Sequence, residues 1–367
     1  MKSMYSKFER SDDHMNLLIN RLDNIQISHK NFPLFPADKM SELNLAGSVV
    51  GTNSEYWVNG KNVMVLVHNP ILKTKIGEQM YQALIRKPMM LFLIPTQENE
   101  FDVSVDALDK LYGIQTINLN NFAQAFSIAC WFIKDSCIRA THTYWLNFFS
   151  GYYSQNSRSM DVTLSDGTIA EINFDDREVQ LAIMMMYAVL RYLLPDEAHT
   201  GDVHMTLSGG TKVWEIDKAM STEGKSFARA LLFLQEARRT GMLSTKIDKY
   251  CSLLECLFAI EGNHKENIAS ITAAYIAKDE AEKKIIKSNM RTAYGVRSDS
   301  SHGGSLKFLR KHNPEDLAEL SKSVDDYVRR VLSKVIAQDE LNYDTSRASK
   351  EKVKKHFLAI LQTGKQN

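Results

Sequence analysis

Arg297 and His302 are the residues of this chain whose types and spacing suggest chemistry most directly. They stand in the stretch RSDSSHGG at 297–304, with four residues between them. A histidine titrates near neutral pH and can move a proton, and the planar guanidinium of an arginine pairs with phosphate oxygens. No other Arg of the chain is followed by a His after four to six residues. The stretch is therefore either a polar loop between helices or half of an active site.

The segment around this pair is basic, although the chain as a whole is nearly neutral. The formal charge is +1, from 45 Lys and Arg against 44 Asp and Glu, which excludes a globally basic nucleic-acid coat and an acidic tail protein. Residues 264–311 carry ten Lys and Arg against five Asp and Glu, and such a patch can hold phosphates. Lys284, Lys287 and Arg291 share one helical face by their spacing and are its expected contact residues.

Other motifs of binding and catalysis are missing or weak. The chain has no G-x-x-x-x-G-K-[ST], G-x-G-x-x-G, H-E-x-x-H or G-x-S-x-G motif. Its histidines do not cluster with Cys or carboxylates at metal-ligand spacing, so no metal and no cofactor are expected. The turn Gly209-Gly210-Thr211 could form an anion nest, but a plain turn before a strand is the simpler interpretation. The pairs Asp175-Asp176 and Asp325-Asp326 are expected to be solvated and structural.

Residues 1–215 are expected to form a mixed α/β domain. Asn59-Gly60 and Asp166-Gly167 each predict a hairpin turn. In the strand expected after Gly167, Ala170, Ile172 and Phe174 alternate with polar residues. The continuous apolar run MMLFLIPT predicts a central strand. Helices are expected at about 73–86, 120–134 and 176–194. The strand order does not follow from the sequence.

Residues 216–367 are expected to form only helices, so the predicted fold class is α+β. Ser221 or Thr222 could cap the first of these helices, and Asn313 before Pro314 predicts the start of another. Short connections between amphipathic helices favour an antiparallel bundle. Arg297 and His302 would then lie in an exposed, polar loop, after a helix that ends near Val296.

Composition places the chain among folded proteins of a reducing compartment. Hydrophobic residues make up 44% of the sequence, and the four cysteines are scattered, which predicts reduced, buried thiols. The start of the chain lacks the long apolar run of a signal peptide, and no window predicts a membrane span. The expected location is therefore cytoplasmic, without membrane contact.

The C-terminal helices carry a resemblance to a known family. LLECLFAIEGN, then a helix, then AYGVRSDSSHGG is similar to the HEPN superfamily, in particular its ApeA-like branch, over residues 222–340. Leu254-Glu255-Cys256-Leu257 and Ala259-Ile260-Glu261 match its Leu- and Glu-rich helix, and Arg297 with His302 match its R-x4-H motif. Ser298 departs from the pattern, since many members have Asn, Asp or His there. The stretch SGGTK is similar, over five residues, to a loop of CARF-type sensors, some of which are fused to HEPN domains.

The resemblance implies a metal-independent endoribonuclease with a HEPN helical domain. Arg297 would hold phosphate oxygens and His302 would move a proton while the 2′-hydroxyl of the RNA attacks. The supporting residues would be Ser298, Asp299, Glu261 and Tyr294, and the RNA-binding residues would be Lys284, Lys287 and Arg291. Family context implies a homodimer with a composite site, a toxin in abortive infection during bacterial anti-phage defence, and tRNA among the candidate substrates. A phage-derived or nucleotide trigger would act on the N-terminal sensor or regulatory domain. The alternative is a non-catalytic HEPN-type interaction or RNA-binding module.

Overall fold

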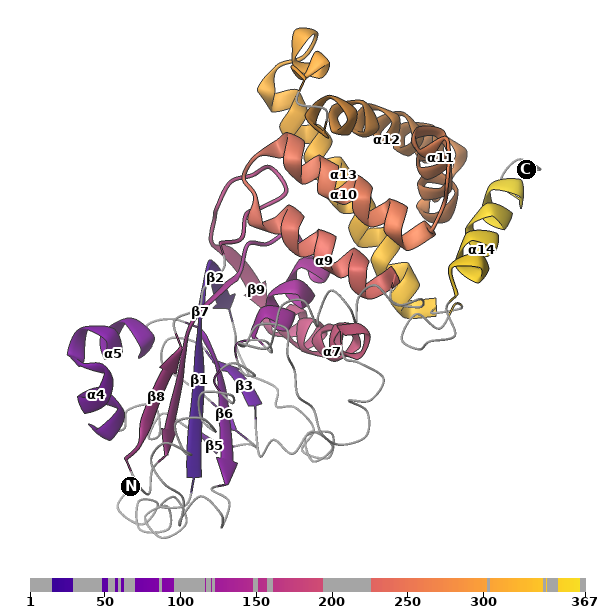
Figure 1. Ribbon diagram of the computed structural model, residues 1–367. Coiled ribbons are helices and arrows are strands. Elements are labelled where there is room, and N and C mark those ends of the chain that lie inside the picture. The colour runs from indigo at the N-terminus through magenta and orange to yellow at the C-terminus, as the bar shows by residue number, and fades with distance from the viewer. Residues whose placement is uncertain are drawn as a thin grey trace.

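The computed structural model describes residues 15–28, 48–51, 57–58, 61–62, 70–85, 88–95, 116, 120, 123–147, 151–156, 161–193, 226–301, 304–338, 341 and 349–363. These residues form a sheet-containing part and a helical part that lie side by side (Figure 1). The chain is thus mixed α and β, as expected. The predicted boundary at 215/216, the turn at 209–211 and the cap candidates Ser221 and Thr222 lie outside the described residues.

A five-stranded antiparallel sheet is the centre of the first part. Its order is β3-β6-β1-β7-β8. The strands are β1 (Met15–Asp23), β3 (Ser48–Gly51), β6 (Met89–Pro95), β7 (Arg139–Asn147) and β8 (Tyr153–Asn156). The run MMLFLIPT is confirmed as an interior strand, β6. In the middle of the sheet, Ile19 of β1 lies between Leu91 of β6 and Tyr144 of β7.

The smaller elements of this part agree in most respects with expectation. β4 (Trp57–Val58) pairs with β5 (Lys61–Asn62), and Val58 lies opposite Lys61, which confirms the two-residue connection at Asn59-Gly60. The expected helices are α4 (Pro70–Ile76) with α5 (Glu78–Ile85), a helix over 123–133, and α7 (Asp176–Leu193). The first is split at Gly77, which has φ +80°.

The hairpin expected at Asp166-Gly167 is wrong. A turn does form, in which Gly167 N donates to Leu164 O at 2.9 Å, but residues 161–165, directly before it, form no strand. β9 (Ile172–Asp175) instead pairs in parallel with β2 (Ile25–Ser28). Phe174 is buried and Ile172 half-buried, as the alternation predicts, whereas Ala170 is exposed.

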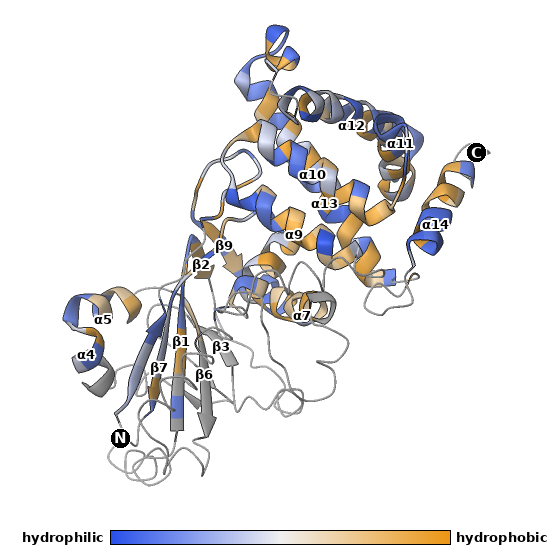
Figure 2. Cartoon of the chain, viewed as in Figure 1, coloured by the Kyte–Doolittle hydropathy of each residue, from blue (hydrophilic) through white to orange (hydrophobic). Residues whose placement is uncertain are grey.

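The second part is a bundle of helices, as expected. It contains α9 (Ser226–Arg239), α10 (Leu243–Phe258), α11 (His264–Ile276), α12 (Glu280–Ser301), the short 3-10 helix η5 (Lys307–Arg310), α13 (Pro314–Gln338) and α14 (Lys350–Thr363). Asn313 caps α13, since its Oδ1 accepts from Asp316 N at 2.7 Å. Hydrophobic and hydrophilic residues alternate along α9, α10 and α13, as helices with one buried side require (Figure 2).

The bundle core includes side chains from the sheet-containing part. Ile128, Trp131 and Phe132, on the helix over 123–133, pack in the same hydrophobic cluster as α10 and α13. The Trp131 indole donates to Asp325 Oδ1 at 2.8 Å, and Tyr250 OH donates to the same oxygen at 2.5 Å.

Asp325 therefore lies in the core, and the expectation that it is solvated is wrong. Its side chain is 1% exposed, and an ion pair with Arg329 compensates its charge. Burial raises the pKa of Asp325 above its usual range. Asp175, by contrast, is exposed and caps α7, accepting from Glu178 N at 2.8 Å, which agrees with a structural role.

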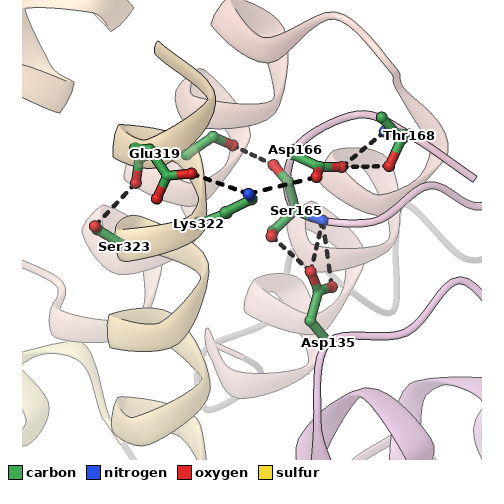
Figure 3. Close-up of polar contacts among 8 residues, drawn as sticks. Asp135, Ser165, Asp166, Thr168, Glu319, Lys322 and Ser323 are labelled. Atoms are coloured by element: carbon green, nitrogen blue, oxygen red, sulfur yellow. Dashed lines mark hydrogen bonds and ion pairs between the residues drawn. The ribbon is translucent and has the colours of Figure 1, made fainter. Parts of the chain in front are cut away.

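The segment 161–170 fastens the two parts together (Figure 3). Ser321 of α13 donates its hydroxyl to the Ser165 carbonyl at 2.5 Å. Ser165 itself donates its N–H and its hydroxyl to Asp135, at 3.0 and 2.6 Å. Lys322 Nζ lies 3.6 Å from Asp166 Oδ2. We call 161–170 the strap.

Two further expectations concern cysteines and membranes. Cys130, Cys137 and Cys251 are buried, Cys256 is half-buried, and all four are free thiols. Within the described part of the chain, no helix has the length and apolar character needed to cross a membrane.

A candidate phosphate-binding pocket around Arg297

Arg297 lies on a helix, not in a loop. α12 continues to Ser301, so the expected helix end near Val296 is wrong, and Arg297, Ser298 and Asp299 belong to its last turns. Contacts with α10 explain the longer helix. Ser301 Oγ donates to Asp248 Oδ1 at 3.1 Å, and Arg297 pairs with the same carboxylate one turn earlier.

The guanidinium of Arg297 is held by two carboxylates of α10. Its Nη2 lies 2.8 Å from Glu255 Oε2, and its Nε lies 3.3 Å from Asp248 Oδ1. The guanidinium carbon also lies 5.4 Å from the ring centre of Tyr294. The side chain is 29% exposed, so the expectation of an exposed Arg297 is wrong. Asp248 and Glu255 are seven residues apart, which places them on one face of α10.

Glu255 is the central acceptor of this arrangement. Its Oε1 accepts a hydrogen bond from Tyr294 OH at 2.6 Å and lies 3.6 Å from His264 Nδ1. Burial, followed by the nearby Cys251 and Glu255, raises the pKa of Tyr294, so its hydroxyl stays protonated and can donate. One carboxylate thus holds Tyr294 and Arg297 of α12 by hydrogen bonds and lies next to His264 of α11.

An open pocket of about 940 Å³ lies beside these residues. Its lining comes from the start of α11, the second half of α12 and the segment 307–312. The basic and acidic residues of the lining are Lys265, Arg291, Arg297, Lys307, Lys311, His264, His312 and Asp299. Cations outnumber carboxylates in this lining, which favours an anionic ligand.

The cations of the pocket differ in how far they are already paired. Arg291 makes two hydrogen bonds to Glu266, at 2.8 and 2.6 Å, and Lys307 pairs with Asp299 at 3.2 Å. Lys265 and Lys311 have no carboxylate within 4 Å among the residues that the structure describes. Among the described residues Arg297 makes one hydrogen bond, from Nη2 to Glu255, and its Nε is buried without one, while the partly exposed side chain lines the pocket.

Several of the expected site residues meet at this pocket. Arg297, Ser298, Asp299 and Tyr294 all line it. Asp299 is 11% exposed and accepts from Lys307 N at 2.8 Å, which lowers its pKa, while its carbonyl accepts from Gly304 N at 3.0 Å. Asp299 thereby fixes the chain that follows residue 303. His302 lies outside the described residues.

Other expected residues lie elsewhere. Of the three expected RNA-binding residues, Arg291 lines the pocket, whereas Lys284 and Lys287 are absent from its lining. Glu261 is also absent from it and pairs with Lys350 at 2.6 Å and Lys354 at 3.6 Å, on α14. Because Glu261 pairs with these two lysines, it does not support the pocket, although it was expected among the supporting residues.

Several titratable residues of the pocket were not predicted from the sequence. His264 and Lys265 begin α11, while Lys311 and His312 follow η5. The ring of His312 stacks on Phe308, with ring centres 4.3 Å apart. Lys311 could have been predicted, because it follows Lys307 at four-residue spacing after a glycine pair. Nothing in the local sequence indicates that His264 approaches Glu255.

No group of three or more His, Cys, Asp and Glu that could hold a metal ion occurs within the described ranges. No family model, no curated protein and no solved structure matches this chain. The pocket is therefore interpreted from its own geometry and charge.

Proposed function

We propose that this chain is a metal-independent endoribonuclease of HEPN type and that the pocket around Arg297 is its cleavage centre. The observation that carries the proposal is Arg297 itself. Glu255 and Asp248 fix its orientation, and part of its guanidinium remains available at a pocket with an excess of cations. A pre-oriented charge can stabilise developing negative charge without reorganisation.

The size and lining of the pocket support a polynucleotide substrate. Cations come from three separate elements, represented by Lys265, Arg291 and Lys311, so they can contact several phosphates in sequence. The stacked pair of Phe308 and His312 adds an aromatic surface, and such surfaces bind unpaired bases.

The chemistry follows from the residue types. The 2′-oxygen of the RNA attacks the adjacent phosphorus, the bond to the 5′-oxygen breaks, and the products end in a 2′,3′-cyclic phosphate and a 5′-hydroxyl. Arg297 holds the non-bridging oxygens as their charge grows. His302, the second residue of the R-x4-H motif, transfers a proton.

The proposal extends to assembly and regulation. Two copies pair through the helical domain with their 297–302 segments near each other, because one Arg and one His make a sparse site that a two-fold axis doubles. The sheet-containing part acts as the sensor of a phage-derived or nucleotide trigger, and the enzyme serves as a toxin of anti-phage defence, with tRNA among its substrates. Light scattering tests the assembly, and a monomer at micromolar concentration contradicts it.

A non-catalytic RNA-binding module is the second candidate. Its supporting observation is the pairing of Arg297 with two carboxylates, which compensates the charge that a phosphate would use. Such a module binds RNA through Lys265 and Lys311 but leaves it intact.

Product analysis after incubation with total RNA in EDTA separates the two candidates. The ribonuclease predicts fragments that end in 2′,3′-cyclic phosphate, formed at an undiminished rate in the chelator. A strict Mg²⁺ requirement or fragments with 3′-hydroxyl ends contradict it. Binding without cleavage favours the module.

A further inference from the structure

His264 stands out because it shares a carboxylate with Arg297 although it is distant in sequence. It is the first residue of α11, and its side chain lines the pocket. Its Nδ1 lies 3.6 Å from Glu255 Oε1, while the other oxygen of the same carboxylate holds Arg297.

The burial of one ring nitrogen indicates which edge of the His264 imidazole faces the pocket. Nδ1 is buried and makes no hydrogen bond to the described residues, whereas the side chain as a whole is 44% exposed. The opposite edge of the imidazole, with Nε2, therefore faces the open pocket. Glu255 lies behind Nδ1, in the place where a carboxylate orients the ring of an acid–base histidine.

The chemistry proposed above requires two proton transfers. The attacking 2′-hydroxyl must lose a proton, and the leaving 5′-oxygen must gain one. His302 is a single proton-transfer group, so the reaction needs a second such group, either from the same chain or from another copy.

We propose that His264 is the general acid of this pocket. This assignment rests on the proposed ribonuclease function. Nε2 of His264 gives its proton to the 5′-oxygen as the P–O5′ bond breaks, while another base takes the proton of the 2′-hydroxyl. Protons and charges balance, because the acid loses one proton to the 5′-oxygen, the base gains one from the 2′-hydroxyl, and the products are a cyclic phosphate and a 5′-hydroxyl. No further reactant is needed.

The test compares two substrates of one RNA sequence. One carries the ordinary 5′-oxygen at the cleavage site, and the other carries a bridging 5′-sulfur. A thiolate leaves without protonation, so the sulfur substrate does not need a general acid. Single-turnover rates in EDTA, RNA affinity and the unfolding midpoint are measured for the wild type, His264→Gln, Arg297→Ala and His356→Gln. His356, on α14, lies outside the pocket lining and serves as the matched His→Gln control.

The proposal predicts that His264→Gln slows cleavage of the oxygen substrate by about 10²- to 10⁴-fold, the usual loss of a proton-transfer group. RNA affinity and folding should change little, and cleavage of the sulfur substrate should return to near the wild-type rate. Arg297→Ala should be slow on both substrates, because its role is charge stabilisation. His356→Gln should behave as wild type.

Each contrary outcome points to a different failure. If the wild type cleaves and His264→Gln cleaves the oxygen substrate equally fast, His264 is not the acid, while the ribonuclease stands. If His264→Gln is slow on both substrates, the residue acts in another way and the assignment is overturned. If the wild type cleaves neither substrate, the ribonuclease proposal fails and the assignment fails with it.

Discussion

The guanidinium of Arg297 connects the chemistry of the pocket to the packing of two helices. It is half-buried between Asp248 and Glu255, whose own side chains are largely covered. Removing it leaves two carboxylates without their cation in a partly desolvated place. The residue therefore contributes to the folded state as well as to the site.

We expect Arg297→Ala to lower the free energy of unfolding by about 1–3 kcal/mol, the range for leaving a buried polar partner unsatisfied. Arg291→Ala is the matched control, since it removes another Arg–Glu pair of α12 whose partners are much more exposed. Arg291→Ala should lower the free energy of unfolding by only a small part of that amount, because exposed ion pairs contribute little. Equal urea midpoints for the two variants would contradict the account.

At the scale of elements, the strap 161–170 lies against the start of α10. A Cβ on Gly167 would lie 2.4 Å from the carbonyl oxygen of Gly241, and Gly167 has φ +82°. Both observations require glycine at this position, for space and for backbone conformation.

Gly167→Ala should therefore destabilise the chain more than Gly262→Ala. Gly262 also has positive φ, +67°, but a Cβ there meets nothing within 4 Å. Gly262→Ala should lower the free energy of unfolding by about 1–2 kcal/mol, because alanine is strained in a left-handed backbone. Gly167→Ala should lower it by about 1–3 kcal/mol more, because the new Cβ also displaces the strap. Thermal and urea unfolding measure both. Equal losses would mean that the strap does not pack on Gly241 in solution.

Lys246, in the first turns of α10, holds the strap from inside the bundle. It is fully buried, and its Nζ donates to Thr163 Oγ1 at 3.0 Å and to the Ala237 carbonyl at 2.7 Å. Burial lowers the pKa of Lys246 to about 8, although Asp325 acts in the opposite direction.

This lowered pKa predicts a pH dependence of stability. Below about pH 8 the lysine is protonated in both folded and unfolded chains, and from there to its ordinary value of 10.5 only the unfolded chain keeps the proton. The free energy of unfolding should thus rise across this window by an amount on the order of 3 kcal/mol relative to Lys246→Met. Urea unfolding of both proteins at several pH values measures it. Parallel pH profiles would show that Lys246 keeps its ordinary pKa.

At the scale of the whole molecule, features fixed by neighbouring residues could be predicted. Asn59-Gly60 predicts its hairpin, MMLFLIPT its interior strand, and Asn313-Pro314 the start of α13, because turn, strand and cap preferences act over a few residues. Tyr294 and Arg297 line one pocket from neighbouring positions of α12, whereas the sequence placed Arg297 in a loop beyond that helix.

Features that depend on distant partners could not be predicted. Asp166-Gly167 forms a turn but no hairpin, since the strap pairs with Asp135 and α13 instead. Asp325 looks solvated on a charged helix, yet Trp131 from the other part covers it. The last turns of α12 form because Asp248 and Glu255, far back in the sequence, hold Arg297 and Ser301. His264 is only nine residues from Glu255, but their approach depends on how α11 follows the end of α10.

The central claim is that Arg297 and its pocket cleave RNA without a metal. Its most direct test is the single-turnover rate in EDTA on one defined RNA, for the wild type and for Arg297→Ala at saturating protein and below the unfolding temperature of both. The account predicts cleavage by the wild type and a loss of about 10²- to 10³-fold in the variant, as for other donors to a developing oxyanion. Equal rates in a folded variant would contradict it.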